Sequence, residues 1–235
     1  MTQIKNILIS GGSSGIGFAI AKQLIKENFN VGIISRENPK QWVKKPPIAW
    51  VIKSNYLKTN FLKFNQTIIK KWLKQNKYLN ALILCANSYG NGARHNFSKT
   101  SLKEWQEIFQ VNVNSQFQLI KLSLPYLSKK PNSLILGITS EVAFKSGEGR
   151  VAYASSKAAS HNLLKNLAQE LSNTNISIVE LLPTNTVDTP GIRKRRSKSF
   201  DFSKYHSPDL FIKPSLSLIN KKNIRFNGKY IKVGV

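Results

Sequence analysis

Short apolar runs alternate along the chain with longer stretches in which apolar residues recur at helical spacing. Most of the runs are continuous rather than alternating, as expected for parallel strands that are buried on both faces. They predict seven strands, at residues 6–10, 31–35, 48–52, 81–86, 133–138, 176–182 and 230–235. Helical spacing predicts helices at 61–75, 101–127 and 156–171, the first with Leu62, Ile69 and Leu73 on one stripe.

This alternation over the whole length predicts an α/β fold. It is typical of a doubly wound (Rossmann) arrangement, a seven-stranded and mostly parallel sheet with helices on both faces. No repeat, low-complexity linker or Pro/Gly-rich boundary divides the chain, so we expect residues 1–235 to form one dinucleotide-binding and catalytic domain. In such sheets ligands bind beyond the carboxyl ends of the strands.

Charge is the unusual part of the composition. The 36 Lys and Arg residues outnumber 11 Asp and Glu, for a formal net charge of +25. Such an excess can indicate nucleic acid, an anionic membrane surface or acidic substrates. Lysine is spread along the whole chain and asparagine is abundant, so we favour compositional drift in an AT-rich coding sequence. The dense basic run is RKRRSK, residues 193–198.

Targeting and redox signals are few. The amino-terminal residues lack the charged region, apolar segment and cleavage site of a signal peptide, and no run approaches the ~18 apolar residues of a membrane span. Cys85 is the single cysteine, which excludes an internal disulfide and a multi-cysteine metal site. His95, His161 and His206 lack metal-ligand spacing, so we expect no metal, and the cytoplasm is the expected location.

A glycine-rich turn joins the first predicted strand to a helix, in ILISGGSSGIGFAI at residues 7–20. A helix amino terminus there favours an anion, and glycine lets the backbone approach a phosphate. Gly11, Gly15 and Gly17 have the spacing G-x-x-x-G-x-G. The turn therefore predicts a dinucleotide phosphate site, against the alternative of a glycine-rich turn with no ligand.

The end of the second predicted strand indicates which dinucleotide would bind. An acidic residue there would bind the two ribose hydroxyls of NAD, but the chain has Ser35 and Arg36, with Glu37 one residue later. An arginine can pair with a 2′-phosphate. We therefore favour NADP(H) over NAD(H), the alternative being that Arg36 is a solvated charge.

A tyrosine and a lysine at helical spacing are the main candidates for catalysis. Tyr153 and Lys157 share a helix face, so a phenol and an ammonium can lie together. A fixed cation would lower the phenol pKa from its usual value near 10. Ser140 ends the fifth predicted strand and would point into the same crevice.

These motifs together resemble the short-chain dehydrogenase/reductase family over nearly the whole chain. SGGSSGIG (10–17), ITS ending at Ser140, and YASSK (153–157) match the family's motifs in order and spacing. FQVNVNSQF (109–117) resembles the helix with the family's active-site asparagine, which falls on Asn112, and NGKYIKVGV (227–235) resembles its last strand.

The resemblance implies roles for these residues. Tyr153 would exchange a proton with the carbonyl or alcohol oxygen, and Ser140 would hydrogen-bond that oxygen. Lys157 would lower the tyrosine pKa and hold the nicotinamide ribose. Asn112 would interrupt its helix and anchor a water. The residues implied to bind the cofactor are Gly11, Ser13, Ser14, Gly15, Ile16, Gly17, Arg36, Asn55, Tyr56, Ala86, Asn87, Tyr153, Lys157, Pro183 and Thr189.

Some positions depart from the family pattern. After the fourth predicted strand, Asn87 occupies the position of a family glycine, and asparagine could adopt the left-handed backbone needed there. We expect Cys85, two residues earlier, to be a buried packing residue. The adenine-capping aspartate after strand three falls on Asn55. After strand six, PTNTVDTPG carries an extra residue, which leaves the contacts of Pro183 and Thr189 open by a residue or two. The VDTP in this segment resembles the V/L-D-T-P arrangement of dihydropteridine reductases.

Several functions stay open from the sequence. The first is an NADP(H)-dependent reductase of a carbonyl, with a 3-oxoacyl thioester on an acyl carrier protein and a pteridine-type substrate as alternatives. The second is a nucleic-acid or membrane-surface binding protein on a reductase scaffold. Residues 190–210 fall where the family has its mobile substrate lid, and their basic run could recruit an anionic or carrier-bound substrate. Glu141 could face the pocket, although a surface position is the simpler interpretation. The family's long helices, here 101–127 and 151–171, predict a homodimer or homotetramer.

Overall fold

The computed structural model describes residues 4–36, 54–90, 95–220 and 224–234. In this part of the chain, seven parallel strands form one sheet in the order β3-β2-β1-β4-β5-β6-β7. The predicted doubly wound α/β fold is confirmed. The strands are β1 (Asn6–Ser10), β2 (Asn30–Ser35), β3 (Ser54–Lys58), β4 (Ala81–Leu84), β5 (Ser133–Ile138), β6 (Ile176–Pro183) and β7 (Lys229–Val233).

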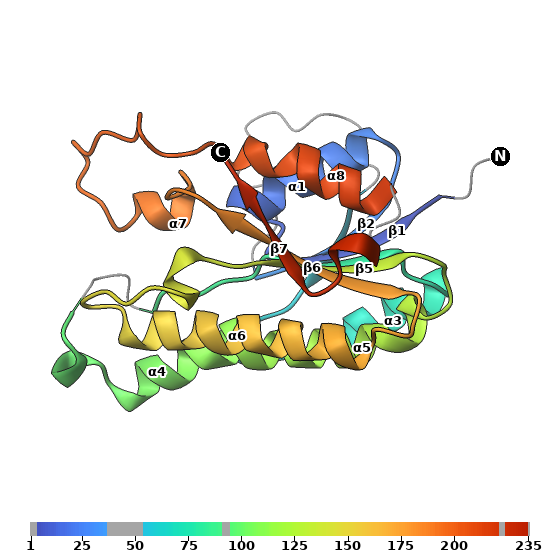
Figure 1. Ribbon diagram of the computed structural model, residues 1–235, viewed down its shortest axis with the longest axis horizontal. Helices are drawn as coiled ribbons and strands as arrows, with labels where there is room; N and C mark the ends of the chain where they lie inside the picture. Colours follow the sequence, from blue (N-terminus) through green and yellow to red (C-terminus); the bar gives the residue numbers. More distant parts are fainter. Residues whose placement is uncertain (1–3, 37–53, 91–94, 221–223, 235) are drawn as a thin grey trace.

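Helices cover both faces of the sheet (Figure 1). On one face lie α1 (Gly15–Lys26) and α8 (Ile212–Asn220), and on the other lie α3 (Thr67–Asn76), α4 (Leu102–Phe109), α5 (Ser115–Leu127) and α6 (Val151–Glu170). The short α7 (Pro190–Arg193) follows β6. Single turns of 3-10 helix occur at Phe97–Lys99, Glu141–Ala143, Pro208–Phe211 and Ile224–Phe226. None of the described helices is long and apolar enough to cross a membrane.

The two faces of β1 explain why the predicted strands are continuously apolar. Ile7 and Ile9 point to one side and pack with Leu24 of α1, whereas Leu8 points to the other side and packs with Leu73 of α3. Successive side chains of a strand face opposite sides, so a strand covered on both sides needs apolar residues at every position. The sheet is therefore the centre of two apolar layers.

The third strand is later in the sequence than predicted. The run at 48–52 lies outside the described residues, and β3 begins at Ser54. Asn55 and Tyr56 are consequently inside the strand, in register with Gly32 and Ile33 of β2, and do not follow it. Because β3 is at the edge of the sheet, its sequence SNYLK needs fewer apolar residues than a central strand, and its pattern is weak.

Two predicted helices also differ in extent. The helix expected at 61–75 begins only at Thr67, and Leu62 lies before it with 42% of its surface exposed. The helix expected at 101–127 is interrupted by a π-helical segment, Gln110–Asn114, between α4 and α5. That interruption is at the position that the resemblance gave to Asn112.

Candidate active site

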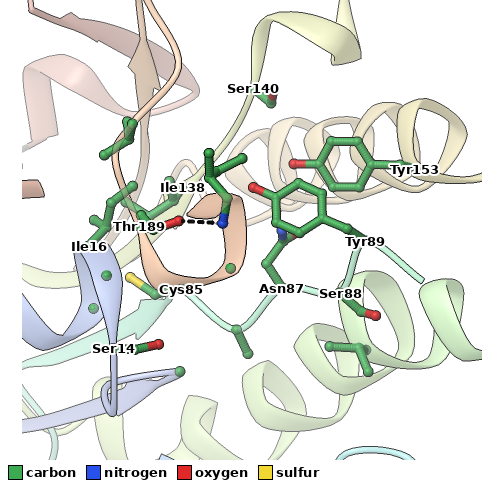
Figure 2. Close-up of a pocket in the computed structure, with 18 of the residues that line it drawn as sticks. Ser14, Ile16, Cys85, Asn87, Ser88, Tyr89, Ile138, Ser140, Tyr153 and Thr189 are labelled. Atoms are coloured by element: carbon green, nitrogen blue, oxygen red, sulfur yellow. Dashed lines mark hydrogen bonds between the residues drawn. The ribbon is translucent and has the colours of Figure 1, made fainter. Parts of the chain in front are cut away.

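A cavity of about 930 Å³ lies at the carboxyl ends of the strands. Its wall comes from the turn after β1, the segment after β4, the end of β5, the start of α6 and the segment from β6 into α7 (Figure 2). This is where doubly wound sheets bind ligands, and the volume suits a dinucleotide with a small substrate.

The glycine turn after β1 forms one end of this cavity. Gly11 has a φ of +72°, and a Cβ there would lie 2.7 Å from the backbone of Ala86. A Cβ on Gly17 would lie 2.4 Å from the carbonyl oxygen of Gly11. Ser14 precedes α1, but its side chain caps none of the helix N–H groups. The turn therefore offers close backbone and uncapped N–H groups, which fit a phosphate.

Ser140, Tyr153 and Lys157 lie together in the wall of the cavity. Tyr153 and Lys157 are one turn apart on α6, and Ser140 follows β5. The side chains of Ser140, Asn87 and Tyr89 lie close enough to the Tyr153 hydroxyl to shift its pKa. The structure thus brings the three predicted catalytic side chains to one place.

The pKa values differ from the prediction that Lys157 acidifies Tyr153. Burial, with the charge and hydrogen bond of Tyr89, raises the pKa of Tyr153 well above its ordinary value, and hydrogen bonds with Asn87 and Ser140 only partly oppose this. Lys157 instead donates a hydrogen bond of 3.0 Å to the carbonyl oxygen of Ile138. The predicted acidification is therefore wrong for this structure, in which burial outweighs any effect of the ammonium.

Lys157 itself is almost fully buried, at 5% exposure. Burial lowers its pKa to about 8, while the negative charge of Glu180 acts in the opposite direction. Glu180 on β6 is also buried, which raises its pKa, and its carboxylate lies 2.5 Å from Nδ1 of His161. His161 is one turn beyond Lys157 on α6. The carboxylate of this buried Glu180–His161 pair therefore favours the charged form of Lys157.

Asn112 positions the site and does not line the cavity. Its side chain is fully buried in the π-helical segment. Its Oδ1 accepts from the Ser88 N–H at 2.7 Å, and its Nδ2 donates to the Ser88 carbonyl and the Ser156 hydroxyl, each at 2.9 Å. It thereby joins the segment after β4 to the residue before Lys157.

Comparisons with known proteins agree with this geometry. The family model described as short chain dehydrogenase matches residues 5–199. The chain belongs to the short-chain dehydrogenase family. A 3-oxoacyl-[acyl-carrier-protein] reductase FabG of Aquifex aeolicus is 25% identical over 239 residues, which cover 98% of this chain and 96% of the relative. An uncharacterized oxidoreductase of Staphylococcus epidermidis is 25% identical over 192 residues, 79% of each chain.

Solved structures have the same fold. A short chain dehydrogenase from Salmonella enterica serovar Typhi has a TM-score of 0.85 at 22% identity, covering 98% of this chain and 96% of that one. One from Shigella flexneri, solved in complex with NADP, has a TM-score of 0.84 at 21% identity, covering 97% and 96%.

At the other end of the cavity, this short-chain dehydrogenase places Arg36 directly after β2. Asn60, Phe61 and Leu62 line the same region. Asn55 and Tyr56, predicted to contact the cofactor, lie within β3, and their contact with the cofactor stays a prediction. Residues 60–62 follow β3 and line the cavity. The sequence did not indicate them, because it placed the third strand too early in the chain.

The segment after β4 departs from the prediction at Asn87. Asn87 is not among the described residues with positive φ, so the expected left-handed backbone is absent there. Its Oδ1 is buried without a hydrogen-bond partner and belongs to the cavity wall with Ala86, so an acceptor is available to a bound donor. Cys85 packs against the core, and burial raises its pKa to about 12, which agrees with a packing role.

Beyond β6, Pro183 and Thr189 both reach the cavity despite the extra residue between them. The Thr189 hydroxyl accepts from the Ile192 N–H at 3.3 Å and caps α7 (Figure 2). Thr184 instead donates to the carbonyls of Val233 and Gly234 and does not line the cavity. Among the described residues, no group of three or more His, Cys, Asp or Glu is placed to hold a metal ion.

Sequence reasoning missed Tyr89. Its ring lies against that of Tyr153, with centroids 4.5 Å apart and an interplanar angle of 35° (Figure 2). The guanidinium of Arg195 lies 3.6 Å from the centroid of the Tyr89 ring, and both residues line the cavity. The only available signal was that Tyr89 follows a strand which ends at the ligand-binding edge of the sheet.

Proposed function

We propose that this protein is an NADP(H)-dependent oxidoreductase that interconverts a carbonyl group and an alcohol. The observation that carries the proposal is that Ser140, Tyr153 and Lys157 lie in one cavity with the glycine turn. A binding protein would need no such arrangement of hydroxyl, phenol and amine.

Each side chain has a defined task in the proposed reduction. Tyr153, kept protonated by its raised pKa, gives its proton to the carbonyl oxygen. Ser140 hydrogen-bonds that oxygen as negative charge develops on it. Lys157 holds the ribose hydroxyls and replaces the proton, and the backbone near Asn112 anchors the water that connects Lys157 to solvent. NADPH, when bound, supplies the hydride.

The preference for NADP(H) rests on Arg36. Its position at the end of β2 and in the cavity wall suits a 2′-phosphate. The wall residues that carry a carboxylate are Glu107 and Glu141, among those described, and neither follows β2; Glu37 lies outside the described residues. NADP in the related Shigella structure also supports this choice.

The direct test is absorbance at the reduced-nicotinamide band. Purified protein receives NADPH or NADH with a panel of ketones, aldehydes, pteridines and acyl thioesters. Consumption of NADPH that depends on a carbonyl supports the proposal, and no consumption with any of them contradicts it. A 3-oxoacyl thioester is the first alternative substrate, because the Aquifex relative is named for it.

A nucleic-acid role has less support. The aromatic residues after the basic run pack within their own loop, with Arg193 over Phe202 and Arg196 over Phe200. Rings used in this way are not presented to bases. Filter binding at ~0.15 M salt tests the role, and measurable affinity would favour it.

We also propose a homodimer or homotetramer in the cytoplasm, with residues 190–210 as a mobile lid. Leu102 on α4 and Phe117 on α5 are 70% and 52% exposed, so these helices present apolar surface to a second copy. Light scattering tests the assembly.

A further inference from the structure

The substrate end of the cavity carries four basic side chains. Arg150 precedes α6, and Lys194, Arg195 and Arg196 follow α7; all four line the cavity, and we name them the basic rim. The acidic side chain in the wall near α6 is Glu141, which lies 3.7 Å from Lys145. The rim therefore has an excess of positive charge close to Tyr153.

The basic run is divided by its contacts into two parts. Arg193 is not among the described residues that line the cavity, and it donates to both carboxylate oxygens of Asp188, at 2.6 and 2.5 Å. Arg196 lines the cavity and donates hydrogen bonds to two neutral groups, the Tyr205 hydroxyl and the Arg195 carbonyl. Its positive charge is thus retained on the cavity side, whereas that of Arg193 is neutralised.

Arg195 is fixed beside the catalytic tyrosine. Its guanidinium stacks on Tyr89 at 3.6 Å and its Nε donates to the Gly191 carbonyl at 3.2 Å. Tyr89 in turn stacks on Tyr153. One aromatic ring therefore separates the guanidinium from the ring of Tyr153.

Arg150 supplies an independent observation. It stands three residues before Tyr153, and its Nε is buried without a hydrogen-bond partner. A buried guanidinium donor without an acceptor is costly and marks a place where a bound oxygen would be favoured. Arg150 lines the same cavity as the residues after α7, and it does so from the start of α6.

We propose that the basic rim selects carbonyl substrates that carry an anionic group, a carboxylate or a phosphate, on the same molecule. Arg195 and Arg196 bind the anion while the carbonyl lies against Ser140 and Tyr153. The inference rests on the proposed function, because it assigns the substrate class of the same site. Arg195 is a specificity residue here, and Tyr89 is its support.

Matched pairs of substrates test the proposal. One pair is 4-oxopentanoate and its methyl ester, and the other is acetoacetyl-coenzyme A and acetoacetyl-N-acetylcysteamine. The members of each pair share the reacting carbonyl. The first pair differs at a carboxylate and the second in the phosphate-bearing part of coenzyme A, so the two pairs separate a carboxylate from a phosphate. We expect kcat/KM to be about 10- to 100-fold higher for the charged member of at least one pair, and the ratio to fall with added salt.

Variants locate the effect. Arg195→Gln and Arg196→Gln should each reduce the charged-to-neutral ratio about tenfold, and Arg195→Lys should keep part of it. Lys198→Gln is the matched control, because Lys198 belongs to the same run but is exposed and outside the cavity wall; it should keep the wild-type ratio.

The outcomes separate the inference from the proposed function. Reduction of the neutral esters with a ratio near one in both pairs, or a ratio unchanged in Arg195→Gln and Arg196→Gln, overturns the anion-selecting rim but leaves the reductase intact. No NADPH consumption with either member of either pair, or with the wider carbonyl panel, overturns the proposed function itself.

Discussion

The ring of Tyr89 lies against the ring of Tyr153, with 4.5 Å between their centroids. Tyr89 comes from the segment after β4 and Tyr153 from α6, so two separate elements place phenols side by side. The second phenol raises the pKa of the first, both by its charge and by its hydrogen bond. Tyr89 is therefore positioned to tune the proton donor.

Tyr89→Phe should lower the pKa of Tyr153, because it removes the hydroxyl that raises this pKa while keeping the ring. In alcohol oxidation the phenolate is the active form, so activity should begin to rise at lower pH than in the wild type. The pH profile of kcat/KM measures this. Tyr230→Phe, on an exposed side chain of β7, is the control; equal profiles for all three proteins would contradict the role of Tyr89.

Tyr153→Phe should abolish the proton transfer and leave the cavity otherwise as it is. We expect kcat to fall about 100- to 10,000-fold while the dissociation constant for NADPH changes less than about threefold. Stopped-flow turnover and fluorescence titration measure the two quantities. Full activity in this variant would show that another group donates the proton.

Local patterns explain what the sequence predicted well. The glycine turn, the Tyr153–Lys157 spacing and the continuous apolar strands each depend on residues close together in the chain. They also sufficed for the family, because motifs in order and spacing are specific to it.

Tertiary context explains what the sequence did not predict. The weak pattern of the edge strand β3 concealed its place in the chain, so residues 60–62, which follow the strand and line the cavity, were not predicted to contact the cofactor. The raised pKa of Tyr153 depends on its burial and on Tyr89. Tyr89 and Tyr153 are 64 positions apart in the sequence and come together only in the fold. No periodicity carries such information.

Arg36→Ala tests the choice of cofactor. If the guanidinium pairs with the 2′-phosphate, the dissociation constant for NADPH should rise about 10- to 100-fold and that for NADH by less than about threefold. Fluorescence titration with each nucleotide measures both. Arg225→Ala, an exposed arginine outside the cavity wall, controls for general loss of positive charge. An equal loss for both nucleotides would remove the argument for a 2′-phosphate.

Gly17→Ala should damage the glycine turn, because its Cβ would lie 2.4 Å from the Gly11 carbonyl oxygen. The start of α1 must then move away from the turn, at a cost of about 1–3 kcal/mol in the free energy of unfolding, and NADPH affinity should fall. Gly191→Ala is the control for stability, since its Cβ meets nothing closer than 4.0 Å. Urea unfolding compares them, and equal stability would show that the turn is looser than described.

Glu180→Gln tests the buried pair behind Lys157. Burial lowers the pKa of Lys157 and the negative charge of Glu180 raises it, and with both effects this pKa is about 8. Because the ammonium is the working form, carbonyl reduction should decline as the pH rises through the pKa of Lys157. In Glu180→Gln this decline should begin at lower pH, since the stabilising charge is gone.

His161→Asn should act in the same direction, because His161 lowers the pKa of Glu180 and so keeps its carboxylate charged. Glu170→Gln is the matched control, since Glu170 is exposed at the end of α6, and it should keep the wild-type profile. Circular dichroism at each pH separates loss of activity from unfolding. A decline at the same pH in Glu180→Gln and the wild type would mean that Lys157 is not the titrating group, or that Glu180 does not reach it electrostatically.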